Sequence, residues 1–137
     1  MASERTTSFS ARLDRRLVER LKLLGARNGL SASQLAERFI DEGLRSEEFP
    51  GLVFRPGPAG RRAGLVGGPD VWEIVRDLHG ARDWGVADPA ATVAAASELS
   101  DAQVRLAAAY YAAYPDEIDA RLADETELTA RLVAELT

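Results

Sequence analysis

The chain has no cysteine, a single histidine and a single methionine, and aromatic residues make up only 7% of its 137 residues. Without cysteine there can be no disulfide, no thiolate nucleophile and no cysteine-ligated zinc or iron–sulfur site. His79 is the only histidine, and no serine has a plausible base with an orienting partner. We therefore expect no enzyme activity, no catalytic residue and no cofactor.

Metal-site spacing is also missing. The acidic pairs Asp116–Glu117 and Asp124–Glu125 have neither the spaced oxygen ligands nor the glycine of a calcium-binding loop. We interpret them as solvated faces and expect no metal site.

Long hydrophobic runs are absent from the sequence. No stretch of about 18 apolar residues could form a membrane-spanning helix. Residues 1–10 lack the basic start and apolar stretch of a signal peptide. The sequence thus predicts a cytoplasmic protein without a membrane partner.

The net charge of -5 argues against a nucleic-acid-binding protein when it is taken as an average. The charge is unevenly distributed, however. Residues 1–27 contain seven basic and three acidic residues, whereas residues 100–137 contain three basic and eight acidic ones. The basic start and the acidic end should prefer different partners.

A stretch of alternating apolar and polar residues lies near the start of the chain. Its two faces are Phe9, Ala11 and Leu13 on one side, and Ser8, Ser10 and Arg12 on the other. A period of two residues is typical of a half-buried β-strand. We expect a short strand here, with the polar face outward.

Two helices are expected directly after this strand. Asp14 is a typical N-cap, and leucines at helical spacing follow it until Asn28–Gly29 ends the segment. Ser31 is a second N-cap, followed by an apolar stripe that contains Leu35 and Phe39. The order strand–helix–helix is therefore predicted for residues 1–49.

Such a unit cannot be stable alone, because a single strand leaves both edges unpaired and two short helices bury little surface. An intertwined homodimer solves both problems by pairing two copies of the strand. The resulting two-stranded ribbon fits the major groove of B-DNA, where Ser8, Ser10 and Arg12 would read bases. The start of the second helix at Ser31, Ala32 and Ser33 would bind a DNA phosphate.

Residues 6–45 resemble the CopG and Arc group of ribbon-helix-helix regulators. The resemblance rests on Phe9-x-Ala11-x-Leu13, Leu17, Leu21, Leu24 and Gly29-Leu30-Ser31-x-Ser33. It implies base reading by the outward strand residues and phosphate binding at the start of the second helix. Ala11 is smaller than the branched apolar residue usual at its position.

Residues 50–68 are rich in proline and glycine, which predicts a loop or linker with a possible short strand at Leu52–Phe54. A helical domain is expected over residues 69–137. Its helices should run from Val71 to a stop at Gly80, from Asp88–Pro89 to about Ala96, and onward from a capping box at Ser100.

Pro115 should interrupt the last of these helices. An amphipathic C-terminal helix with Thr126 as a possible second cap is expected after it. The fold class is thus mainly α, with a helix-turn-helix-like second domain. DNA reading by this half is disfavoured because it is acidic, although Arg61 and Arg62 could touch a phosphate.

The second half also resembles a small bacterial domain of uncharacterised function found in VapB-type antitoxins. The matching segments are Val71-Trp72-Glu73-Ile74-Val75 and Tyr110-Tyr111-Ala112-Ala113-Tyr114-Pro115, whereas Gly67-Gly68-Pro69 replaces the usual Gly-Thr-Arg. The resemblance implies a toxin–antitoxin pair whose toxin is a PIN-like ribonuclease with a carboxylate metal site.

The sequence therefore predicts a type II antitoxin that represses its own operator as a dimer and neutralises the toxin through its C-terminal half. The expected assembly is a homodimer or, with the toxin, a higher oligomer. The residues expected to bind the toxin are Ile118, Arg121, Leu122, Leu128, Arg131 and Leu132. Arg121 and Arg131 are either anchors for toxin carboxylates or pair with neighbouring acids on a solvated face. The alternative function is a stand-alone ribbon-helix-helix regulator whose second domain senses a ligand or oligomerises.

Overall fold

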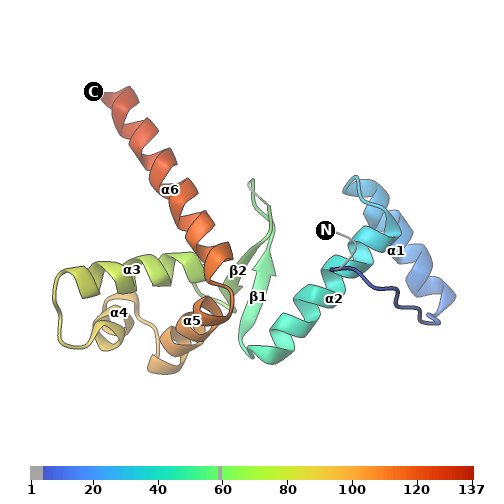
Figure 1. Ribbon diagram of the computed structural model, residues 1–137, viewed down its shortest axis with the longest axis horizontal. Helices are drawn as coiled ribbons and strands as arrows, with labels where there is room; N and C mark the ends of the chain where they lie inside the picture. Colours follow the sequence, from blue (N-terminus) through green and yellow to red (C-terminus); the bar gives the residue numbers. More distant parts are fainter. Residues whose placement is uncertain (1–4, 59) are drawn as a thin grey trace. The chain divides into compact units, whose positions relative to one another are not determined.

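The structure is a computed structural model that describes residues 5–58 and 60–137. These residues form a mainly helical fold with one small two-stranded antiparallel sheet (Figure 1). In chain order the elements are α1 (Arg15–Arg27), α2 (Ala32–Glu48), β1 (Leu52–Arg55), β2 (Arg62–Leu65), α3 (Val71–Asp83), α4 (Pro89–Ser97), α5 (Asp101–Ala113) and α6 (Pro115–Leu136).

The chain divides into two compact units, Met1–Gly43 and Leu44–Thr137. The division falls inside α2, whereas the sequence places it after residue 49. The expected linker over residues 50–68 contains the sheet, whose residues belong to the core of the second unit.

The two helices of the first unit begin at the predicted caps. The Asp14 carboxylate accepts a hydrogen bond from the backbone N–H of Arg16 at 2.7 Å and starts α1. Ser31 and Gln34 form a reciprocal capping box at the start of α2, with hydrogen bonds of 2.9 and 3.1 Å. Both helix starts are confirmed.

The turn between α1 and α2 is a Schellman motif. The backbone N–H of Leu30 donates to the carbonyl oxygen of Gly25 at 2.8 Å, and Gly29 has a left-handed φ of 67°. Gly25 is buried, and a Cβ atom added there would lie 2.7 Å from the carbonyl oxygen of Leu30. The close approach of the turn to α1 therefore requires glycine at this position.

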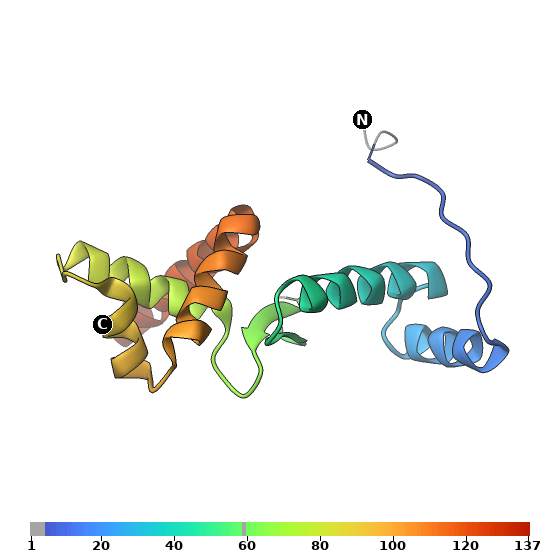
Figure 2. The ribbon, with the colours of Figure 1, turned by 90° about the horizontal axis from the view of Figure 1, so that it is seen from below.

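The strand expected around Ser8, Ser10 and Arg12 does not form in the single chain. Residues 6–14 adopt neither helix nor strand and are exposed along their whole length, as the irregular segment before α1 shows (Figure 2). A single strand has no neighbour for its backbone N–H and C=O groups, so one copy cannot form the ribbon. The strand prediction concerns the paired form.

The second unit has a contiguous hydrophobic core. Helices α3, α4, α5 and α6 and both strands supply buried side chains to it, and the largest is Tyr110. Strands β1 and β2 pair antiparallel, with Leu52 opposite Leu65 and Arg55 opposite Arg62. The possible strand at Leu52–Phe54 is confirmed, and its partner β2 was not expected.

The hairpin is joined to α3 through a buried carboxylate. Asp70 is 7% exposed and accepts hydrogen bonds from Arg55, at 2.8 Å, and from the Nε atom of Arg62. It also forms the N-terminal capping box of α3 with Glu73. One carboxylate thus neutralises the two opposed arginines of the sheet and starts the next helix.

Two helix predictions in this unit are wrong. Gly80 does not end α3, which continues to Asp83, because a glycine inside a packed helix costs only about 1 kcal/mol. Thr126 does not cap a second segment, because its hydroxyl donates to the carbonyl oxygen of Leu122 within a continuous α6. The caps at Asp88 and Ser100 are confirmed.

Over the described residues, every helix is too short or too polar to cross a membrane.

Candidate functional site

The first unit buries almost nothing by itself. Among its described residues only Gly25 and Leu35 are buried. Its large apolar side chains instead lie on the surface, including Phe9, Leu13, Leu17, Leu23, Leu24, Phe39 and Ile40, with exposed fractions from 40% to 82%. A folded chain rarely leaves so many large apolar side chains of one unit uncovered unless they form an interface.

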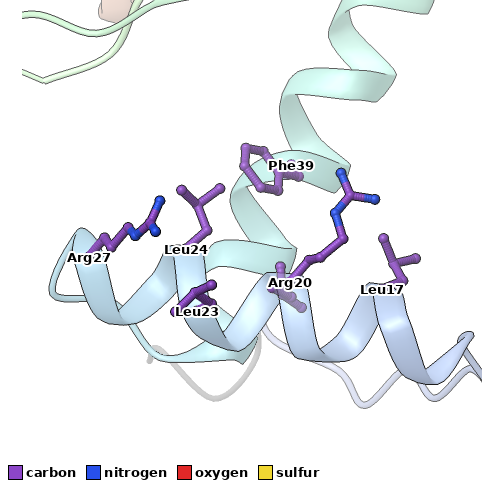
Figure 3. A pocket seen from close by; sticks show the side chains of 7 residues that line it. Leu17, Arg20, Leu23, Leu24, Arg27 and Phe39 are labelled. Atoms are coloured by element: carbon purple, nitrogen blue, oxygen red, sulfur yellow. The ribbon is translucent and has the colours of Figure 1, made fainter.

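Part of this apolar set forms a hollow between α1 and α2. The hollow has a volume of about 320 Å³. Leu17, Leu24 and Phe39 line it, and the side chains of Arg20 and Arg27 stand beside them (Figure 3). An apolar surface with two cations beside it is suited to a protein partner with apolar side chains.

The predicted base-reading residues Ser8, Ser10 and Arg12 are all exposed in the segment before α1. The structure brings none of the three into contact with another described element. They are therefore accessible to solvent and lie in irregular backbone in the single chain.

The predicted phosphate-binding residues lie at the start of α2. Ser31 is committed to the capping box, because its hydroxyl accepts from Gln34 and its N–H donates to the Gln34 side chain. Ala32 and Ser33 follow in the first turn, where backbone N–H groups have no acceptor within the helix. The donors available to an anion are therefore the N–H groups of Ala32 and Ser33 and the exposed Ser33 hydroxyl.

The residues predicted to bind a toxin divide between the core and the surface of α6. Ile118 is 3% exposed and belongs to the core of the second unit, and Leu122 packs against that core. Neither is presented to a partner, because α6 uses its first turns to complete the unit. Ile118 is thus a core residue and not the contact residue that the sequence indicated.

Both predicted arginine anchors are paired within α6. Arg121 pairs with Glu125 at 2.9 Å, and Arg131 pairs with Glu127 at 2.6 Å. This is the arrangement expected if the arginines pair with neighbouring acids. Arg131 is largely exposed, whereas the side chain of Arg121 is only 19% exposed and lies against the second unit.

The distal part of α6 extends beyond the other helices of the second unit (Figure 1). It carries an uncovered apolar stripe that consists of Leu128, Leu132, Val133 and Leu136, each at least 51% exposed. At 100° per residue this stripe continues the face that buries Ile118 and Leu122. The core-facing side of α6 is therefore longer than the core it covers.

A network that the sequence analysis missed joins α5, α6 and Arg45. Arg45 donates hydrogen bonds to the Tyr110 hydroxyl at 2.7 Å and to Glu117 at 2.9 Å, and its guanidinium lies 4.0 Å from the centre of the Tyr114 ring. Tyr110 in turn donates to Glu117. A proline–acid turn after an aromatic pair was the only sequence signal for this cluster.

The cluster shifts two pKa values. Burial, and then the hydrogen bond and negative charge of Glu117, raise the pKa of Tyr110 far above its usual value. Burial alone would lower the pKa of Arg45, but the hydrogen bonds and charges of Tyr110 and Glu117 outweigh burial and raise it. The network is a neutral phenol held between a fixed cation and a carboxylate, which is a structural role.

In the part of the chain that the structure describes, no three His, Cys, Asp or Glu side chains gather closely enough to hold a metal ion. No protein-family model, curated protein or solved structure matches this chain.

Proposed function

We propose that this chain is a homodimeric, DNA-binding repressor of the ribbon-helix-helix type that also binds a protein partner through α6, as an antitoxin does. The observation that carries the proposal is the exposed apolar set of the first unit. A unit whose described residues bury only Gly25 and Leu35 needs a partner to cover its apolar side chains, and a second copy would supply matching helices.

Dimer formation would also complete the DNA-binding surface. In a dimer two copies of residues 6–14 can pair as antiparallel strands, with Phe9 and Leu13 turned toward the helices. Arg12 then points outward, where its guanidinium can form two hydrogen bonds with a guanine edge. The first 27 residues carry a net positive charge, which favours a DNA phosphate backbone.

The DNA-binding function is tested by measuring the affinity of the full chain for the DNA upstream of its own gene. Replacing Arg12 with alanine should weaken specific binding by about 1 to 3 kcal/mol per lost base contact. Lys22→Ala is the matched control, because it removes one positive charge from the exposed face of α1 outside the ribbon. If both variants lose the same DNA affinity, the removed charge alone explains the loss, and base reading by Arg12 is refuted.

The antitoxin function is supported by the apolar stripe on distal α6. An amphipathic helix of this kind binds in the apolar groove of a partner protein. Residues 123–137 carry four acidic side chains and one basic one, so two copies of the stripe would repel each other. A partner with a basic rim, such as a ribonuclease toxin, matches this charge.

The antitoxin function is tested by co-expression with the protein encoded by the neighbouring gene. The full chain should relieve the growth arrest that this protein causes. A chain ending at Ala123 keeps Ile118 and Leu122 in the core, so it should still bind DNA but should no longer protect the cells. If the shortened chain protects as well as the full one, α6 is not the neutralising element. If the neighbouring protein is harmless, the stand-alone regulator is the better description.

A further inference from the structure

The second unit contains a polar hollow that none of the proposed functions uses. It has a volume of about 440 Å³ and lies where the hairpin, the start of α3 and α6 meet. A smaller hollow of about 200 Å³ adjoins it, and both are lined by Arg62, Trp72 and Arg121. The two hollows are therefore neighbours that share these three side chains.

Cations exceed anions in the larger hollow. Arg55, Arg62 and Arg121 face two carboxylates, those of Asp70 and Glu73. Asp70 is shared by both Arg55 and Arg62, so a single negative charge serves two guanidinium groups. Arg121, however, pairs with Glu125 outside this lining, so the third positive charge is already balanced.

Arg121 contributes a hydrogen-bond donor that the fold leaves unsatisfied. Its Nε atom is buried and has no acceptor among the described residues, whereas one terminal nitrogen pairs with Glu125. A buried N–H without an acceptor is costly, and native structures usually satisfy such a group with a protein acceptor, an ordered water or a bound ion. A rotation of the guanidinium would present its Nε–Nη edge to the hollow, the geometry with which arginine binds a carboxylate through two parallel hydrogen bonds.

Trp72 supplies an aromatic surface beside these donors. Its indole N–H donates to Asp70 at 3.3 Å, which fixes the ring, and its ring lies 6.0 Å from the guanidinium carbon of Arg121. The residue is half-buried, so part of the ring remains accessible. An apolar or aromatic group attached to an anion would contact it.

We propose that these neighbouring hollows bind a singly charged organic carboxylate, with the carboxylate between Arg62 and Arg121 and its apolar body against Trp72. One carboxylate would supply the acceptor that the Arg121 Nε atom lacks. A phosphate dianion would face Asp70 and Glu73 without enough cations to balance it. The proposal concerns the second unit alone and does not depend on DNA binding or on a partner for α6.

The experiment is a fluorescence titration of the full-length Trp84→Phe variant with benzoate. Trp84 is 89% exposed, so its replacement should leave the fold intact and Trp72 as the only tryptophan. Benzoate should change the Trp72 emission saturably. Benzamide, which has the same shape without the charge, should not, and inorganic phosphate should bind more weakly than benzoate.

Two substitutions on α6 separate a specific site from a general effect of charge. Arg121→Gln should weaken benzoate binding about ten- to a hundredfold, because it removes a charge-assisted pair of hydrogen bonds. Arg131→Gln is the control, since Arg131 is also paired with a glutamate on α6 but lies outside the hollow. Arg121→Lys should give an intermediate loss, and unchanged circular dichroism would show that each variant is folded.

A further arm of the titration distinguishes a small acid from a peptide carboxylate. A short peptide ending in phenylalanine with a free C-terminus is compared with its C-terminal amide. Tighter binding of the free peptide than of benzoate would assign the site to a chain terminus, and the reverse would assign it to a small organic acid. Absence of saturation, an equal response to benzamide, or full affinity in folded Arg121→Gln would overturn the proposal.

Discussion

Tyr110 places its hydroxyl between the guanidinium of Arg45 and the carboxylate of Glu117, in the buried centre of the second unit. Its ring also makes edge contacts with Phe49 at 5.3 Å and with Phe54 at 6.5 Å between ring centres. The phenol is therefore both a large apolar side chain and a satisfied polar group. Replacing it with phenylalanine removes only the second property.

The stability of the protein should fall at high pH because of this residue. The pKa of Tyr110 is raised above its usual value of 10.0, so the fold favours the protonated phenol. That contribution is complete below pH 10 and is lost progressively as the pH rises above 10 toward the raised pKa. The free energy of unfolding measured by urea denaturation should therefore decrease more steeply above pH 10 in the native chain than in Tyr110→Phe.

The comparison is best made in a Tyr111→Phe background. A hydrogen bond with Asp119 and partial burial also raise the pKa of Tyr111, which would add a second transition of the same sign. At neutral pH, Tyr110→Phe should cost about 1 to 3 kcal/mol, because Arg45 and Glu117 lose a buried partner. Identical pH profiles with and without the Tyr110 hydroxyl would contradict this account.

Individual contact residues of the second unit could be predicted only where they follow a local rule. Asp70 stands directly before the apolar stripe of α3 with Glu73 three residues later, which is a capping-box spacing. Its role as the shared partner of Arg55 and Arg62 was not predictable, because it depends on strand register. The arginines are opposite each other only after β1 and β2 have paired.

At the scale of elements, helix starts were predictable and the hairpin was not. Asp14, Ser31, Asp88 and Ser100 each cap the expected helix through a short-range hydrogen bond, which sequence spacing specifies. Strand β2 has no alternation of polar and apolar residues. It contains Gly64, where a Cβ atom would lie 2.2 Å from the guanidinium of Arg55. Gly64 is thus explained by packing against Arg55 of β1, which the local sequence does not reveal.

The turn between α1 and α2 provides a test at this scale. Gly25→Ala places a methyl group 2.7 Å from the Leu30 carbonyl oxygen, which is backbone and cannot rotate away. We expect a loss of about 1 to 3 kcal/mol in unfolding free energy, as for other overpacked sites. Gly43→Ala is the matched control on α2, since nothing lies within 4 Å of its added Cβ.

The control substitution should be neutral or stabilising by up to about 1 kcal/mol, because alanine favours a helix more than glycine does. Both variants are compared by thermal unfolding, followed by circular dichroism at one protein concentration. If Gly25→Ala has the same melting temperature as Gly43→Ala and the native chain, the close approach at Gly25 does not constrain the turn.

At the scale of the whole molecule, the two units differ in how much hydrophobic core each of them forms. Among the described residues, the second unit has a core of twelve buried hydrophobic residues, whereas the first unit buries only Leu35 and Gly25. Sequence patterns indicated the need for a partner, because an isolated strand and two short helices cannot close a core. They could not specify the partner, because one chain carries no information on which surfaces meet.

Measuring the oligomeric state shows whether the apolar set of the first unit is covered by a second copy of the chain or by another protein. We expect the full chain to sediment as a dimer. Phe39→Glu should dissociate it, because Phe39 lies in the apolar hollow with Leu17 and Leu24 and a buried carboxylate costs several kcal/mol. Each 1.4 kcal/mol raises the dissociation constant about tenfold, so the variant should be monomeric at micromolar concentration.

The control is Leu136→Glu, which introduces the same charge on distal α6, where the leucine is 87% exposed. It should remain a dimer, because like charges already disfavour pairing of two α6 helices. If Leu136→Glu dissociates the dimer and Phe39→Glu does not, the copies meet through α6, and the apolar set of the first unit is covered by something else. In that case residues 6–14 have no strand to pair with, and the ribbon proposed to read DNA cannot form.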